Sequence, residues 1–233
     1  MTQGLACTLA VIALMAMAGT AAPDDFLKTY KGTPFQDARQ TAGRQTIPGR
    51  VQCALYDRGG EGVAYHDADP KNHGSGELNP PDGTYLNQFR MDEGADISYT
   101  KFHRTPIPID DNPFNAVTPR ENQLYVGWTE PGEWFNVTVE VEQEGEYDSS
   151  LLYTSNRGGT ISFDVNGKAA AYDVPIASTY DERDPVAWRQ WHHWNVAPAV
   201  VRMHLPAGKA VLTLHVVSGG QMNFAYLDVV RGR

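Results

Sequence analysis

The sequence predicts an all-β sandwich, and three observations carry that prediction. From Ile47 onward, short apolar or alternating runs are separated by clusters of Gly, Pro, Asn and Asp, a spacing typical of sandwiches of short strands. The pair Asn166-Gly167 stands between two such runs and favours a tight hairpin, because both residues tolerate a positive φ. No heptad pattern, internal repeat or helical run of useful length appears. The 233 residues suffice for one such domain rather than two.

The first residues have a different character from the rest. Residues 5–18 form an almost unbroken apolar run without charge, followed by the small residues Gly19-Thr20-Ala21-Ala22. This pattern predicts a signal peptide over residues 1–22, cleaved near Ala22. A membrane anchor is the alternative, but the run is shorter than the ~20 residues that a bilayer requires. We therefore expect a secreted protein, extracellular or periplasmic.

The remaining chain divides into a polar N-terminal extension, residues 23–46, with one short helical turn expected at 34–42, and a β-sandwich domain, residues 47–233. The clearest strands are predicted at residues 133–141, 147–154, 160–165, 168–174, 200–205, 211–218 and 222–230. Residues 65–123 are rich in Gly, Pro, Asp and Asn and read as a long loop insertion. A loop of this length in a compact domain is usually functional, so we expect it to build a wall beside a binding site.

Composition narrows the range of functions. Cys53 is the only cysteine after the predicted signal, so an internal disulfide is not expected, and its alternating neighbours predict a buried strand position for it. The net charge of −9 argues against nucleic acid and anionic membranes as partners. Strongly anionic polysaccharides are also disfavoured unless a local basic patch overrides the charge. The net charge of the protein neither favours nor disfavours neutral sugars as ligands.

Several short motifs follow one another in a recognisable order. They are Ile47-Pro48-Gly49-Arg50-Val51-Gln52, Asp92-Glu93-Gly94-Ala95-Asp96-Ile97, Val126-Gly127-Trp128, Trp188-Arg189-Gln190-Trp191, Leu205-Pro206-Ala207-Gly208 and Met222-Asn223-Phe224-Ala225-Tyr226. This ordered set resembles the family 6 carbohydrate-binding modules and their relatives on the galactose-binding-like jelly roll. The resemblance implies a jelly-roll β-sandwich of two antiparallel sheets that binds a polysaccharide or oligosaccharide without catalysis.

In such modules two aromatic rings sandwich a sugar, and an Asn at the start of the last strand hydrogen-bonds its hydroxyls. Carried onto this chain, the resemblance assigns ligand binding to Trp128, Trp188 and Asn223. The chemistry agrees, because an indole offers flat apolar area to the C–H face of a pyranose and an amide offers both a donor and an acceptor. Trp134 and Trp191 are expected in the core.

Many of these modules hold a structural calcium with two acids on the first strand and one on the last. Here those places are occupied by Gln52, Ala54 and Ala225, and a methyl group cannot ligate a hard cation. We therefore expect no calcium there and no other cofactor. A different calcium site, using Asp67, Asp69 or Asp92, stays open.

Two alternatives to a sugar-binding module remain. One is a glycoside hydrolase or lyase on a jelly-roll scaffold, which would need paired catalytic groups. Candidates are Asp92, Glu93, Asp96, Glu130, Glu133, His66-Asp67 and His192-His193. No HExxH, GxSxG or dinucleotide-binding motif accompanies them. The other alternative is a protein-binding adhesion module. The favoured hypothesis is a non-catalytic protein that acts alone or beside carbohydrate-active enzymes encoded elsewhere.

Overall fold

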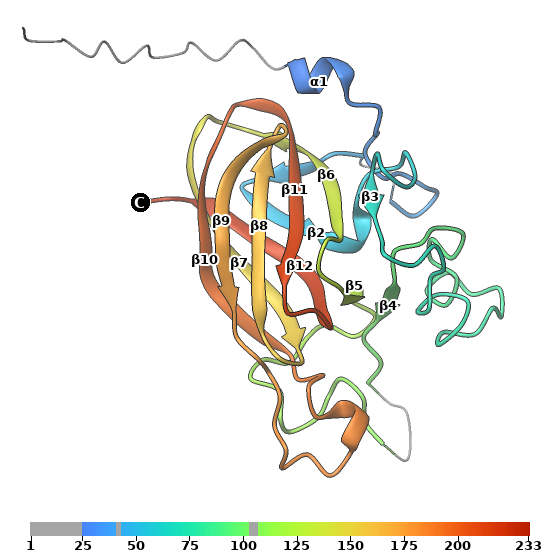
Figure 1. Cartoon of the computed structure of the whole chain (residues 1–233). Helices are drawn as coiled ribbons and strands as arrows, with labels where there is room; N and C mark the ends of the chain where they lie inside the picture. Colours follow the sequence, from blue (N-terminus) through green and yellow to red (C-terminus); the bar gives the residue numbers. More distant parts are fainter. Residues whose placement is uncertain (1–24, 41–42, 103–106) are drawn as a thin grey trace, which may run out of the picture.

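The computed structural model describes residues 25–40, 43–102 and 107–233. Within them, two six-stranded sheets pack face to face as a β-sandwich (Figure 1). This architecture confirms the predicted fold class, a jelly-roll β-sandwich. The predicted signal peptide, residues 1–22, lies outside the described residues. No helix of the described part is long and apolar enough to cross a membrane.

One sheet has the order β1-β6-β11-β8-β9, with β3 pairing with β6. Its strands are β1 (Gln45–Ile47), β3 (Tyr65–His66), β6 (Trp134–Val141), β8 (Gly159–Val165), β9 (Lys168–Ile176) and β11 (Gly208–Ser218). The other has the order β10-β7-β12-β5-β4, with β2 pairing with β12. Its strands are β2 (Gly49–Gln52), β4 (Ile97–Tyr99), β5 (Leu124–Thr129), β7 (Gly145–Ser155), β10 (Asn195–Leu205) and β12 (Met222–Arg231). Pairing is antiparallel except between β1 and β6.

Alternation along the strands explains the core. On β8, Ile161 and Phe163 are completely buried, while Ser162 between them is only half-buried. A strand presents successive side chains to opposite faces, so this pattern places one face of the sheet against the other sheet. Asn166 and Gly167 have φ angles of 53° and 69°, which close the β8–β9 hairpin as the sequence predicts.

Each of the seven predicted strands overlaps one of β6 to β12. Two local predictions were wrong. Cys53 is buried as expected, but it begins the short 3-10 helix η1 (Cys53–Leu55) rather than lying in a strand. No helical turn forms at residues 34–40, and the short helix of the extension is instead α1 (Asp25–Thr29).

The insertion, residues 65–123, contributes only β3 and β4 as regular elements in its described part. Polar side chains replace the missing ladder bonds: the Oδ1 atom of Asn72 accepts the backbone N–H groups of Gly74, Ser75 and Ile97 at 3.0, 2.8 and 3.2 Å. Gly74 must be glycine here, because a Cβ would lie 2.0 Å from the Ile97 carbonyl oxygen. The described part of the insertion is therefore packed against the domain along the edge strand β4.

Candidate functional site

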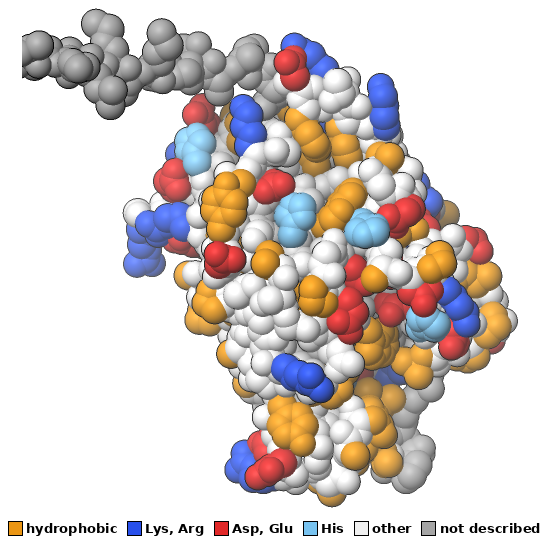
Figure 2. All heavy atoms as spheres, in the orientation of Figure 1, with side chains coloured by type: hydrophobic (Ala, Val, Ile, Leu, Met, Phe, Trp, Pro, Cys, Tyr) orange, Lys and Arg blue, Asp and Glu red, His pale blue; other side chains and the backbone are white. Residues whose placement is uncertain are grey.

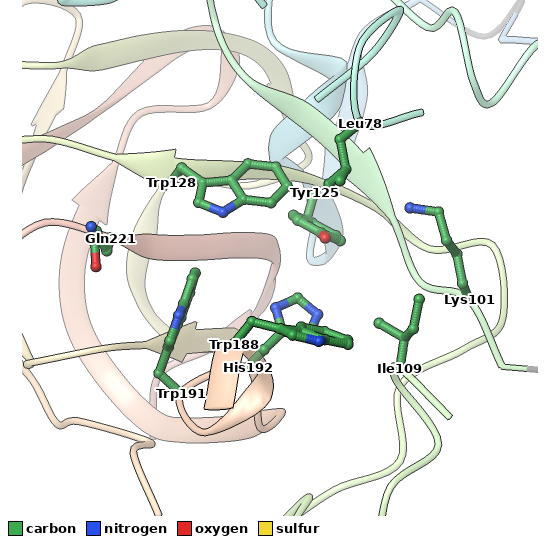
Figure 3. Close-up of a pocket in the computed structure, with 9 residues that line it drawn as sticks. All are labelled: Leu78, Lys101, Ile109, Tyr125, Trp128, Trp188, Trp191, His192 and Gln221. Atoms are coloured by element: carbon green, nitrogen blue, oxygen red, sulfur yellow. The ribbon is translucent and has the colours of Figure 1, made fainter. Parts of the chain in front are cut away.

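A cavity of about 610 Å³ opens at one end of the sandwich, where loops from separate parts of the chain meet (Figure 3). It is lined by Leu78, Lys101, Ile109, Tyr125, Trp128, Trp188, Trp191, His192 and Gln221. The first three belong to the insertion, so residues 65–123 supply one wall of this cavity. The others come from β5, from the loop around the 3-10 helix η2 (Ala187–Arg189), and from the turn before β12.

Three tryptophans dominate the cavity. Trp128 and Trp188 lie on opposite sides of the space, and Trp191 stands on a third side near Gln221 (Figure 3). The side chain of Trp188 is 53% exposed, whereas Trp128 and Trp191 are half-buried. The structure thus brings together the two rings that the sequence assigned to ligand binding.

The core assignments of the other two tryptophans need correction. Trp191 lines the cavity, because it follows the turn of η2 in a loop where strand alternation does not apply. Trp134 is half-buried on β6 beside His66, with ring centroids 6.4 Å apart, and does not line the cavity. Trp194 is the completely buried tryptophan, and it packs in a smaller cluster with Tyr125, Leu152 and Ala225.

Trp128 owes its direction to a local distortion of β5. Along this strand, Gly127 and Trp128 together face the single residue Asn223, a β-bulge of the kind that redirects a side chain. Trp128 has a φ of 50°, an uncommon and strained value for a bulky residue. Its N–H donates to Oδ1 of Asn223 at 2.9 Å, and glycine at 127 leaves room for that oxygen, which a Cβ would approach to 2.9 Å.

Asn223 lies behind the cavity wall rather than on it. Its side chain is completely buried, and its Nδ2 donates to Oγ1 of Thr154 at 2.8 Å and to Nδ1 of His192 at 3.0 Å. Together with the bond from Trp128, these contacts engage both ends of the amide. The residue that the sequence assigned to sugar hydroxyls therefore holds two residues of the wall in place.

The hydrogen bond from Asn223 also determines the tautomer of His192. Because Nδ1 accepts, the proton of the neutral ring sits on Nε2, which donates to Oδ1 of the buried Asp110 at 2.8 Å. Trp194 donates to the same oxygen at 2.6 Å. Burial would raise the pKa of Asp110, but its interactions with His192 and Trp194 outweigh burial and lower it. The sequence drew attention to His192, while Asp110 lies in the insertion without any motif around it.

A second buried network joins two walls of the cavity. Arg189 donates to both carboxylate oxygens of Asp184, at 2.7 and 2.8 Å, and its third nitrogen donates to the Pro108 carbonyl of the insertion. His193 bonds to the same carboxylate at 2.9 Å. Burial acts to raise the pKa of Asp184, but these donors lower it to about 2. The loop that carries Trp188 is thus tied to the insertion.

The acidic residues weighed for catalysis lie elsewhere. Burial, together with the charges of Asp67 and Asp96, raises the pKa of Glu133 to about 7. Burial likewise raises the pKa of Asp96 to about 6. The carboxylate of Glu133 accepts the backbone N–H groups of Ala68 and Glu130 at 3.2 and 2.9 Å, so it braces two turns. None of these acids lines the aromatic cavity.

The calcium position of the resembled family does not suit a metal ion in this chain. Ala54 and Ala225 are completely buried methyl groups, and Oε1 of Gln52 accepts Nε2 of Gln123 at 2.7 Å. Across residues 25–40, 43–102 and 107–233, no group of three or more His, Cys, Asp and Glu side chains is arranged to hold a metal ion.

Comparisons with known proteins give matches among solved structures only. No family model matches the chain, and no curated protein matches it. The module CsCBM6-3 from Clostridium stercorarium, in complex with cellobiose, is 11% identical, with a TM-score of 0.47 over 82% of this chain and 100% of that one. The carbohydrate-binding module CBM6cm-2 from Cellvibrio mixtus lichenase 5A, in complex with cellotriose, is 19% identical, with a TM-score of 0.37 over 47% of this chain and 79% of that one. A family 35 carbohydrate-binding module from Clostridium thermocellum is 19% identical, with a TM-score of 0.38 over 59% of this chain and 92% of that one. Among solved structures, the chain is thus similar to family 6 and family 35 carbohydrate-binding modules.

Proposed function

We propose that this protein is a secreted, non-catalytic carbohydrate-binding protein that holds a sugar ring between Trp128 and Trp188. The observation that carries the proposal is the pair of indole rings on opposite sides of a cavity of about 610 Å³. Cavities of roughly 300–1,000 Å³ with apolar walls and a few polar groups are typical of small-molecule sites. An indole loses little conformational entropy on binding, so paired rings suit the C–H faces of a pyranose.

The shape of the cavity favours the end of a sugar chain. Leu78 and Ile109 from the insertion stand opposite Trp191, so the space between the two rings is bounded on further sides (Figure 3). A long flat polysaccharide would need an open groove to pass through. Chain ends or branches fit this arrangement better.

In this proposal Asn223 acts through its neighbours. It anchors the backbone of Trp128 and the ring of His192 and is itself completely buried. Asn223 is therefore a positioning residue for the ring that stacks on the sugar. Secretion is part of the same proposal and rests on the signal-like pattern of residues 1–22.

A polysaccharide-acting enzyme is the second candidate, and one observation favours it. Burial raises the pKa values of Asp96 and Glu133 to about 6 and about 7. Such values suit a general acid near neutral pH. Against this candidate, the bonds from Ala68 and Glu130 give Glu133 a structural task.

The test is a binding screen against soluble and insoluble polysaccharides, with the release of reducing ends and unsaturated products followed in the same samples. Trp128→Ala is expected to weaken binding by about 10-fold or more, in line with the 1–3 kcal/mol carried by aromatic anchors. Trp134→Ala is the matched control, because Trp134 is half-buried outside the cavity, and it should bind as the wild type does. Circular dichroism of both variants checks that the sandwich is retained.

Two results would overturn the proposal. Product release by the wild type that is abolished in Glu133→Gln would establish the enzyme. Absence of binding to every glycan would leave the protein-binding adhesion module as the better hypothesis.

A further inference from the structure

The polar groups of the aromatic cavity are mainly hydrogen-bond donors. Three of the residues that line it are tryptophans, Trp128, Trp188 and Trp191, and an indole has one N–H donor and no acceptor. Across residues 25–40, 43–102 and 107–233, none of these three N–H groups donates to a protein atom. The nitrogen of the Trp128 ring lies on the side that faces Trp191 (Figure 3). These donors are therefore open to a ligand.

A further donor comes from Gln221, in the turn before β12. Nδ2 of Asn156 donates to Oε1 of Gln221, which fixes the end of the amide that carries the oxygen. The other end, Nε2, carries two donor hydrogens and has no hydrogen-bond partner within the described part of the chain. Gln221 is exposed and lies near Trp191 (Figure 3). Its amide nitrogen is thus the group that remains for a ligand.

The backbone holds two of these donor residues in an uncommon conformation. Both Trp128 and Gln221 have a φ of 50°, and strained values of this kind collect at binding sites. The N–H of Gln221 donates to the Thr129 carbonyl at 2.6 Å, and its own carbonyl accepts the N–H of Asn156 at 3.1 Å. Both residues are therefore fixed before a ligand arrives, which reduces the entropy lost on binding.

The acceptors in the cavity wall are already engaged. Nδ1 of His192 accepts from Asn223 at 3.0 Å, and its Nε2 donates to Asp110 at 2.8 Å. The buried Tyr125 hydroxyl is hydrogen-bonded with Ser98. Figure 2 shows Asp and Glu side chains on the visible surface, but none of the described residues that line the cavity is an Asp or a Glu. A ligand in this space therefore meets more open donors than open acceptors.

This imbalance discriminates among sugars. A free hydroxyl that accepts from an indole or an amide must still place its own proton. Where the lining acceptors are engaged, that O–H gives up its bond to water without replacement, a loss worth about 10- to 100-fold in affinity. An acetyl ester removes the O–H, supplies a carbonyl that only accepts, and adds a methyl group that suits apolar walls.

We propose that the sugar held in this cavity carries an O-acetyl group whose carbonyl oxygen accepts from Nε2 of Gln221, with the indole N–H of Trp191 as the second donor on that side; this inference rests on the proposed function. An N-acetyl group would supply the same carbonyl. It keeps an N–H donor that needs an acceptor of its own, so the ester suits this cavity better.

The test uses glycosides that differ in one substituent and are titrated by tryptophan fluorescence. They are methyl β-glucoside, its mono-O-acetyl esters, its mono-O-ethyl ethers and methyl N-acetyl-β-glucosaminide, with the corresponding forms in the galacto, manno and xylo series. The wild type should bind at least one acetate about 10-fold or more tightly than its parent. The ethyl ether at the same position adds apolar area without the carbonyl, so it should bind several-fold less tightly than the acetate.

Two variants remove the proposed donors. Gln221→Glu keeps an oxygen for Asn156 but replaces the Nε2 donor with an acceptor, and it should lower the ratio of acetate affinity to parent affinity about 10-fold. Trp191→Phe keeps an aromatic ring without the N–H and should lower the same ratio by a smaller factor. Because the readout is a ratio within each variant, a general loss of affinity does not imitate the effect.

Gln143→Glu is the matched control. Gln143 is exposed in the turn between β6 and β7, outside the cavity, and its Oε1 likewise accepts from a neighbour, Arg231. The substitution makes the same change of charge, and it should leave the ratio of acetate affinity to parent affinity at the wild-type value.

The possible outcomes distinguish this inference from the proposed function. Acetates that bind no more tightly than their parents or their ethyl ethers would overturn the inference and leave the sugar site intact. Tighter binding of an N-acetyl glycoside than of every acetate would overturn it too, as would a full acetate preference retained in both Gln221→Glu and Trp191→Phe. Absence of binding to all glycosides and polysaccharides would overturn the proposed function and this inference with it.

Discussion

Replacing Asn223 with alanine tests whether this side chain positions the cavity wall or contacts the sugar. The substitution removes one acceptor, for the Trp128 N–H, and two donors, to Thr154 and His192, with bond lengths between 2.8 and 3.0 Å. All three bonds start from a completely buried side chain. We expect Asn223→Ala to lose both stability and affinity, because the same bonds serve the fold and the direction of Trp128.

The magnitude follows from the number of bonds. A buried donor or acceptor left without its partner costs about 1–3 kcal/mol, so three such groups imply a loss of about 3 kcal/mol or more in the free energy of unfolding. That is a large part of the ~5–15 kcal/mol that stabilises a typical domain. Trp128, with a φ of 50°, would also lose the bond that holds its backbone in a strained conformation, so affinity should fall about 10-fold or more.

Urea unfolding and a sugar titration measure the two effects, and Asn136→Ala is the matched control. Asn136 lies on β6, is 5% exposed, donates to the Val63 carbonyl at 2.8 Å and accepts from Thr213 at 2.6 Å, away from the cavity. The Asn136→Ala variant should have a lower free energy of unfolding than the wild type but the same affinity for the sugar. If Asn223→Ala keeps the wild-type stability and still loses affinity, then Asn223 contacts the sugar directly and the positioning argument is refuted.

Three further predictions concern other parts of the molecule. Trp188→Ala should lower the affinity for the sugar about 10-fold. It should change the free energy of unfolding by less than ~0.5 kcal/mol, because the ring is 53% exposed. The control is Tyr172→Ala on β9, where the side chain is 70% exposed, and it should change neither quantity. Arg189→Met leaves the buried Asp184 carboxylate without its main partner, so urea unfolding should show a loss of about 3–5 kcal/mol, and a loss below ~1 kcal/mol would contradict the buried ion pair. The pKa of Glu133 is about 7 in the folded protein, against an ordinary value of 4.5, so the folded state holds this proton more tightly and stability should fall as pH rises from about 4.5 to 7. Glu133→Gln should remove on the order of 1–3 kcal/mol of that fall between pH 4.5 and 8, and an unchanged pH slope would contradict the assignment.

The local sequence pattern was sufficient to predict the strands in the second half of the chain. Alternation placed the strands that became β6 to β12, and Asn166-Gly167 marked the hairpin between β8 and β9. These signals survive because a strand with one buried face has a period of two, whatever its partners are. The sequence pattern did not predict the backbone conformation of Cys53 or of residues 34–40. Apolar residues do not recur at regular intervals there, and tertiary contacts determine the conformation.

The residues that line the cavity divide in the same way. Trp128 and Trp188 were found because they stand in motifs beside turns, and both line the cavity. Trp191 was assigned to the core, but it lies in the loop after η2 and lines the cavity. Lys101 was not found, because it lies in the insertion, where no motif or period points to it.

By itself the sequence determined the all-β class, most strand positions and the two tryptophans on which the proposed site depends. Only the tertiary structure decided what surrounds them. The bulge of β5 against Asn223 sets the direction of Trp128, and the Asp184–Arg189 pair ties the tryptophan loop to the insertion. The physical reason is that strand alternation is local to a few residues, whereas a cavity wall depends on bonds between segments far apart in the chain. Arg189 and Pro108 are one such pair, as are Trp128 and Asn223, and no single segment records that they meet.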